Sequence, residues 1–238
     1  MRDTLQAILA GTHATMTGID FFKSGLCFHC HLAKQELEEY QFFHAETEQS
    51  WKSRDSTLQD HISSILEKFP AADHDEIVGG HGWELHLNQV KCPDIHRTAL
   101  VVAVYVFLED HLNGLCEIVA DTLDARVRLV DIRGQGTERA VTYLTKVAEF
   151  DFGAIPSLGF VQDVRRLRNK LVHAGAVLPD GEGDKLNRFV RRQVGLRGDP
   201  GHTVRIDSSF IDQLVSKFQA FFGELDGQVQ HFMHRVSA

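Results

Sequence analysis

Apolar residues recur along most of this chain at alternating intervals of three and four positions, the period of a helix with one buried face. Between residues 33 and 70 this pattern is sparse, and charged residues separate its members. The members of this sparse stripe are Leu37, Tyr40, His44, Thr47, Trp51, Leu58, Ile62, Ile65 and Phe69. The pattern predicts a long helical arm that ends at Pro70, either as one helix or as two with a break near residues 50–56. Packing within a bundle and packing against another chain both fit its sparse stripe.

A denser stripe follows in the middle of the chain and predicts the central core helix. Its members are Val101, Val104, Leu108, Leu112, Leu115 and Val119. Asp94 lies just before the stripe and is a suitable N-cap. Residues 71–92 contain Gly79, Gly80 and Gly82, and this glycine-rich composition predicts a loop.

Three further helices are indicated in the second half of the chain. After a loop at residues 131–136, Thr137 caps a short helix, and Ser157 caps the next one, whose stripe contains Val164 and Leu167. The last helix follows Asp207 or Ser208 and carries Ile211, Leu214, Phe218, Phe221, Leu225, Val229 and Phe232. Residues 189–196 and 203–206 are β-compatible and flank a turn-rich segment at 197–201, which predicts a small hairpin.

These elements predict an all-α protein, a bundle of four to five main helices with a long N-terminal helical arm and a small β-hairpin insertion. The 238 residues suit one domain, with the arm at residues 33–70 and the core bundle at residues 94–235. No low-complexity segment interrupts this organisation.

Charge is distributed unevenly along the chain. The net charge is −8, which argues against a nucleic-acid-binding protein. Residues 161–205, however, contain ten Lys or Arg and five Asp or Glu, so this segment carries about +5. A basic surface on an acidic body can still bind phosphate.

The apolar runs are short for a membrane protein. Residues 1–10 do not read as a secretion signal, and the longest apolar run, residues 99–108, is well below the roughly 20 residues that span a bilayer. We therefore expect a cytoplasmic protein with no membrane partner and with reduced cysteines.

Cys27, Cys30 and His31 form a Cys-x-x-Cys-His motif, the pattern of covalent c-type haem attachment. Zinc is an alternative, because two thiolates and one imidazole could supply three ligands. There is no second Cys-x-x-Cys pair, so chance clustering among the chain's 14 histidines is the third explanation. We expect no metal and no cofactor here.

The segment from Asp163 to Gly175 combines an apolar helix stripe with Arg168, Asn169 and His173. Gly175 follows directly where a helix would end. Arginine binds two phosphate oxygens with its planar fork, and histidine exchanges protons near neutral pH. The string Leu167-Arg-Asn-Lys-Leu-Val-His173-Ala-Gly175 resembles the motif of the HEPN (higher eukaryotes and prokaryotes nucleotide-binding) family. Residues 93–97, which lead into the central helix with Glu109, resemble the segment that precedes the motif helix in that family.

The resemblance covers the second half of the chain and implies a metal-independent ribonuclease. In this interpretation Arg168 binds the phosphate, His173 transfers a proton, and Asn169 orients either partner. Glu109 would orient Arg168, and Arg165 and Lys170 would contact phosphate. Five residues at about 100° each place Arg168 and His173 roughly 140° apart on the helix. Either the helix unwinds at His173, or a second subunit completes the site, and the resemblance implies a homodimer whose two motif helices meet.

Other functions remain open at this point. The resemblance implies a toxin or antiphage effector whose partners would be RNA and a cognate antitoxin such as a small nucleotidyltransferase. A HEPN-like module that binds a nucleotide or a protein without cleaving RNA fits the acidic charge somewhat better. A metal- or haem-binding protein that uses the cysteine-histidine cluster is the third possibility. For the motif itself a purely structural interpretation is also open, with Arg168 paired to Asp163 or Glu109 and His173 bonded to a carbonyl at the helix end.

Overall fold

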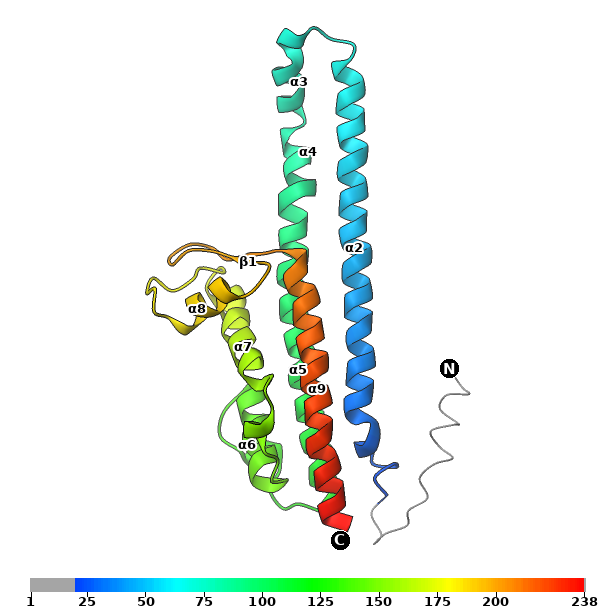
Figure 1. The fold of residues 1–238 in the computed structure, drawn as a ribbon, viewed down its shortest axis with the longest axis vertical. Coiled ribbons are helices and arrows are strands. Elements are labelled where there is room, and N and C mark those ends of the chain that lie inside the picture. Colours follow the sequence, from blue (N-terminus) through cyan, green and yellow to red (C-terminus); the bar gives the residue numbers. More distant parts are fainter. Residues whose placement is uncertain (1–19, 238) are drawn as a thin grey trace.

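The computed structural model describes residues 20–237, and nearly all of its regular structure is helical (Figure 1). After a short 3₁₀ turn, Leu26–Phe28, the helix α2 runs without a break from His29–Leu66. The predicted arm is thus a single helix that ends before Pro70. Its distal half extends beyond the other long helices, so the arm projects from the bundle (Figure 1).

The return segment of the arm is helical, and the prediction of a loop at residues 71–92 is wrong. It contains a 3₁₀ turn, Ala71–Asp73, then α3, His74–Gly80, α4, Gly82–His86, and a π-helical turn, Leu87–Lys91. The central helix α5, Cys92–Thr122, follows directly, so Asp94 lies inside a helix and does not cap one. Pro93 cannot donate to a carbonyl four residues earlier, and the wide π turn just before it accommodates that missing bond.

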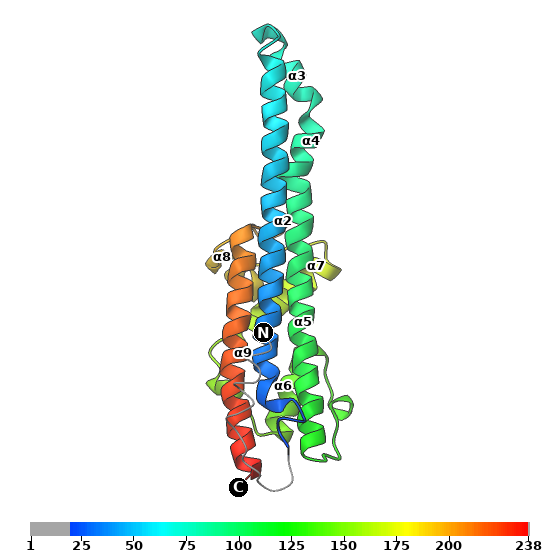
Figure 2. The ribbon, with the colours of Figure 1, turned by 90° about the vertical axis from the view of Figure 1, so that its right-hand side faces the viewer.

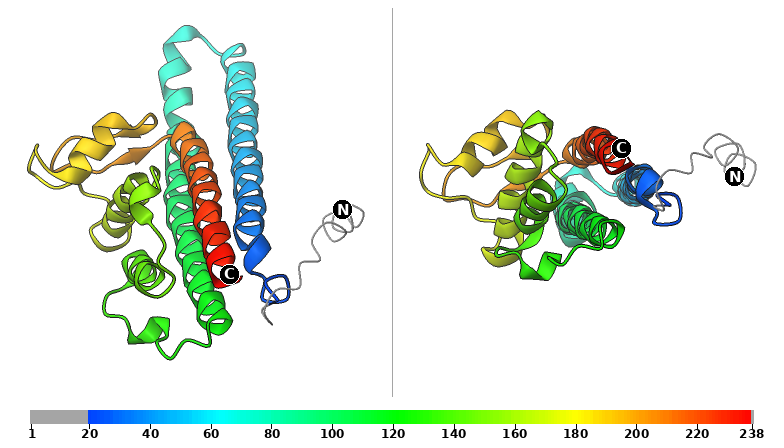
Figure 3. Two further views of the ribbon diagram at one scale, coloured as in Figure 1. Left: turned by 60° about the horizontal axis from the view of Figure 1, so that its bottom comes forward. Right: turned by 90° about the horizontal axis from the view of Figure 1, so that it is seen from below.

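The remaining helices pack on two sides of α5 (Figure 3). Helix α9, Ser208–Ser237, packs against both α2 and α5. On the other side of α5 lie α6, Gly136–Val147, and α7, Leu158–His173, with α8, Lys185–Arg192, packed on α7. Two 3₁₀ turns, Leu129–Asp131 and Phe152–Ala154, precede α6 and α7. The predicted all-α architecture of four to five main helices, α2, α5, α6, α7 and α9, is confirmed.

The core forms where the predicted stripes meet. All six members of the α5 stripe and all seven of the α9 stripe are buried. Aromatic rings fill much of this space, because α9 alone buries Phe210, Phe218, Phe221, Phe222 and Phe232. Burial of such rings is the main favourable contribution to folding.

Two predicted cap residues lie at the right helix ends but bond elsewhere. The Oγ and backbone N–H of Ser157 both donate to the Glu224 carboxylate in α9, at 2.5 and 3.0 Å. Thr137 is the second residue of α6, and its hydroxyl is hydrogen-bonded to Tyr105 in α5. These hydroxyls therefore join helices to each other.

The predicted hairpin exists but is shorter than expected. β1, Leu196–Arg197, pairs antiparallel with β2, Arg205–Ile206. The prediction of a strand over residues 189–196 is wrong, because residues 185–192 form α8. The Asp184 side chain caps that helix by accepting from the Leu186 N–H at 2.7 Å.

Among the described residues, one stretch, 82–122, is long and apolar enough to cross a membrane by length and composition alone. Half of its most apolar window is buried inside the protein. Within the bundle α5 packs against α2, α6, α7 and α9.

Candidate functional site

Helix α7 carries the motif, and its buried stripe fixes which way the motif residues face. Val161, Val164 and Leu167 are buried against the core. Arg168 follows the stripe and is partly buried, whereas Asn169 is exposed. The helix stays regular through His173, and Gly175 then adopts the left-handed conformation with φ +58°, as the sequence predicted for the residue after the helix.

Arg168 is seated on an aromatic ring of the central helix. Its Cζ lies 5.6 Å from the ring centre of Tyr105, a cation–π arrangement. Its Nη1 donates to the Asn169 Oδ1 at 3.2 Å, and its Nε is buried without a hydrogen-bond partner among the described residues. An unpartnered donor in a buried position is uncommon in folded proteins.

Tyr105 is the residue of this site that sequence reasoning missed. It is 1% exposed, and its hydroxyl is 3.0 Å from the Thr137 Oγ1. Burial raises the pKa of its phenol, and the nearby negative charge of Glu109 adds to that effect, while Thr137, Arg165 and Arg168 oppose it. In the sequence, Tyr105 lies in the helix that follows residues 93–97 and beside its apolar stripe, a position that is typical of an ordinary core residue.

Glu109 lies one turn beyond Tyr105 on α5 and is partly buried. No hydrogen bond or ion pair joins it to Arg168, and its carboxylate instead lies against the backbone of Gly136. A Cβ at Gly136 would be 2.9 Å from the Glu109 Oε2. Its negative charge acts on Tyr105 and Arg165 through space.

Arg165 and Lys170, the residues predicted to contact phosphate, have different partners in the structure. Arg165 forms an ion pair with Glu138 at the start of α6, and that hydrogen bond raises the pKa of the guanidinium. Asp163 pairs with Arg166, so it does not engage Arg168. Lys170 is partly buried, and its carbonyl accepts from Ala174 and Ala176 at the helix end.

His173 is the last residue of α7 and is exposed to solvent. No hydrogen bond to its ring is found in the described part of the chain, so the carbonyl bond expected of a purely structural histidine is not formed. Arg168 and His173 do not contact each other. Because the helix does not unwind at His173, one subunit does not bring the two side chains together.

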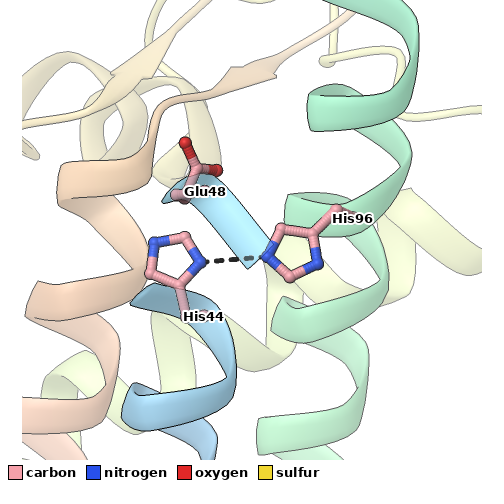
Figure 4. A group of neighbouring side chains, drawn as sticks. All are labelled: His44, Glu48 and His96. Atoms are coloured by element: carbon pink, nitrogen blue, oxygen red, sulfur yellow. Dashed lines mark hydrogen bonds between the residues drawn. The ribbon is translucent and has the colours of Figure 1, made fainter. Parts of the chain in front are cut away.

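A second polar cluster lies at the base of the arm and was not singled out from the sequence (Figure 4). The Nδ1 of His44 in α2 faces the Nε2 of His96 in α5 at 3.1 Å, and the His44 Nε2 is 2.8 Å from the Ser208 Oγ in α9. One turn along α2, Glu48 accepts from the Nε and Nη2 of Arg97, both at 2.8 Å. The i, i+4 spacing of His44 and Glu48 was visible, but their partners on distant helices were not.

The electrostatics of this cluster follow from its burial. His44 is 1% exposed and Glu48 is 6% exposed. Burial lowers the pKa of His96, and the neighbouring His44 lowers it further. Burial alone would raise the pKa of Glu48, but the hydrogen bonds and charge of Arg97 outweigh it and lower that pKa overall.

One atom each from His44, Glu48 and His96 lies within 4.8 Å of the other two, close enough for three metal ligands. Their present bonds are of another kind. The two imidazole nitrogens point at each other, and both Glu48 oxygens accept from Arg97 (Figure 4). The cluster as arranged joins α2, α5 and α9, and it does not present three free ligand atoms.

The Cys27–His31 motif does not converge on one point. Cys30 is fully buried in the core, and burial raises the pKa of its thiol to about 12, which disfavours the thiolate that a metal needs. The His29 Nε2 is hydrogen-bonded to the His111 carbonyl at 2.9 Å, and His31 is exposed. The spacing of this motif in sequence therefore does not become a set of ligands in space.

Comparisons of the chain with protein-family models, with curated proteins and with solved structures find no match. The HEPN resemblance thus rests on the motif residues themselves. Arg168 and His173 share one helix, Arg168 lies on Tyr105 with Arg165 nearby, and His173 is open to solvent.

Proposed function

We propose that this chain is a metal-independent endoribonuclease of the HEPN type that acts in the cytoplasm as a homodimer. The observation that carries the proposal is the Arg168 to His173 segment on an apolar helix that ends at Gly175. Support comes from the position of the Arg168 guanidinium over the Tyr105 ring and from the exposed ring of His173. RNA cleavage without a metal requires a positioned cation that binds the phosphate and an accessible group that transfers protons.

The proposed reaction is attack of the ribose 2′-hydroxyl on the adjacent phosphorus. His173 removes the hydroxyl proton, and the new P–O bond forms as the bond from phosphorus to the 5′-oxygen breaks. Water protonates that oxygen, which releases a 5′-hydroxyl and leaves a 2′,3′-cyclic phosphate, and the hydroxide that remains takes back the proton held by His173. Arg168 stabilises the charge that develops on the phosphate oxygens, Asn169 holds Arg168, and Arg165 and Lys170 bind flanking phosphates.

The geometry of α7 favours a site shared by two subunits. Arg168 and His173 point roughly 140° apart on a regular helix, so Arg168 of one copy would act with His173 of the other. Mixing Arg168→Ala with His173→Ala protein tests this directly. After subunit exchange, half of the dimers are mixed and each contains one intact site, so about a quarter of wild-type activity should return. A site within one subunit would give no recovery.

The core experiment uses wild type, Arg168→Ala and His173→Ala protein on single-stranded RNA in EDTA. Either substitution should lower the rate by about 10²–10⁴-fold, with circular dichroism unchanged because neither side chain belongs to the core. Cyclic phosphate ends identify the reaction. Activity that requires added magnesium, or equal activity in all three proteins, would contradict the proposal.

A HEPN-like module that binds a nucleotide or protein without cleavage is the second candidate. The net charge of −8 and the existing Arg165–Glu138 ion pair favour it, because both weaken attraction for a polyanion. A folded wild type that cleaves no RNA would support this module. For the ribonuclease, a toxin or antiphage role with a small nucleotidyltransferase antitoxin is the biological setting that we propose.

A further inference from the structure

An open groove with a volume of about 530 Å³ runs between α2 and α5. It lies along residues 36–43 of α2 and residues 96–107 of α5. Its apolar surface comes from Tyr40, Phe43, Ala99, Leu100, Ala103 and Phe107. The two alanines on α5 leave a hollow between the aromatic rings. Phe43 is 55% exposed, although phenylalanine side chains are usually buried in a folded protein.

The neighbouring helix α9 shows what this helix pair packs with. Figure 2 shows α2 between α9 and α5, and no helix of the described chain lies over the furrow between α2 and α5. Phe107 connects the two surfaces, since its ring centre is 6.3 Å from that of Phe222 in α9 and 5.4 Å from that of Tyr40. A helix with an apolar stripe already fills one side of the pair, and a helix on the open side would complete a four-helix arrangement.

The rim of the groove is acidic. Glu36 and Glu39 line it on α2, and no Lys or Arg lines it among the described residues. Burial raises the pKa of the Tyr40 phenol, and the negative charges of Glu36, Asp110 and Glu39 raise it further. The potential in the groove is therefore negative, which favours a cationic partner.

We propose that this groove binds an amphipathic helix of another protein, with an apolar stripe flanked by Lys or Arg. Its floor on α5 extends from His96 to Phe107, about 16 Å, which matches three turns of a helix. A second copy of this chain fits poorly, because a two-fold contact would place Glu36 and Glu39 of both copies against each other. The proposal stands on the groove alone and does not depend on ribonuclease activity.

The test uses a labelled helical peptide of about 16 residues with leucines at i, i+3, i+4 and i+7 spacing and lysines beside them. A second peptide has glutamate in place of every lysine. Fluorescence anisotropy on the full chain should show micromolar binding of the lysine peptide that weakens with salt, and no binding of the glutamate peptide.

Three variants locate the binding. The double change Glu36→Lys with Glu39→Lys should weaken lysine-peptide binding by about tenfold and permit the glutamate peptide to bind. Ala103→Trp fills the hollow and should weaken both the affinity and its dependence on the leucines. Glu38→Lys is the matched control, since Glu38 is exposed on the opposite face of α2. The proposal is overturned if the lysine peptide does not bind, or if the double variant binds it like Glu38→Lys.

Discussion

The guanidinium of Arg168 lies over the ring of Tyr105, with 5.6 Å between the Cζ and the ring centre. The cation of the motif helix is thereby positioned by a residue of α5, and that residue is held in turn by Thr137 of α6. A cation–π contact of this kind contributes about 0.5–2 kcal/mol. Three helices must therefore pack correctly before Arg168 takes its place.

Substitution of Tyr105 should separate the two contacts of its side chain. Tyr105→Phe keeps the ring and loses the bond to Thr137, so it should lower the free energy of unfolding by about 1 kcal/mol. Tyr105→Leu also removes the ring under Arg168 and should cost about 2–4 kcal/mol. Urea unfolding measures both changes. In a double-mutant cycle with Arg168→Met, a coupling energy of zero would show that the contact does not form in solution.

The sequence predicted the helices whose apolar stripes meet in the core. The spacing that placed Val101 to Val119 on one face of α5 depends only on local periodicity, and the same holds for α9. Gly175 marked the end of α7 because a left-handed residue there favours glycine. These features succeed because the local signal and the packed structure agree.

The failures have tertiary causes. Gly79, Gly80 and Gly82 indicated a loop, but the segment is helical, a π turn joins it to α5, and α2 packs along one side of it. Residues 189–192 are β-compatible locally, yet the Asp184 cap and burial of Phe189 and Val190 select a helix. The His44, Glu48, His96 and Arg97 cluster joins residues about 50 positions apart, which no local pattern reveals.

Breaking the ion pair at the base of the arm should be costly. The Glu48 and Arg97 side chains are only 8% and 18% exposed. Removal of one partner therefore leaves the other charge unpaired in a site where water solvates it poorly. Glu48→Ala and Arg97→Ala should each lower the free energy of unfolding by about 3 kcal/mol. The exposed Arg128–Asp121 pair is the matched control, and Asp121→Ala should cost less than about 1 kcal/mol. Equal costs at the two sites would contradict the importance of burial.

Stability should fall as the solution becomes acidic because of His96. Its pKa is lowered in the folded protein, so the unfolded chain binds more protons at mildly acidic pH. The contribution is complete above an unfolded-state pKa of about 6.5 and is lost as the pH falls toward the folded-state value. His29, whose pKa burial also lowers, acts in the same direction. Urea unfolding at about pH 8 and about pH 5.5 measures the difference.

His96→Gln isolates the part of this effect that belongs to His96. The variant is less stable at high pH because it loses the bond to His44, but its stability should change less with pH than that of the wild type. Ligand-free protein is used throughout, so that no binding equilibrium contributes. A variant with the same pH dependence as the wild type would assign the effect to other groups.

Two glycines should respond to alanine with opposite signs. Gly136 opens α6 with φ +59°, a conformation that costs an L-residue about 1–2 kcal/mol, and its new Cβ would lie 2.9 Å from the Glu109 Oε2. Gly136→Ala should therefore destabilise the protein and displace Glu109 from beside Tyr105 and Arg165. Gly159 is the exposed second residue of α7, and no neighbouring atom lies within 4 Å of an added Cβ, so Gly159→Ala should stabilise the protein by about 0.4–1 kcal/mol. Thermal and urea unfolding of both variants measure the two changes in stability. Stabilisation by Gly136→Ala would show that Gly136 does not adopt a positive φ at the start of α6.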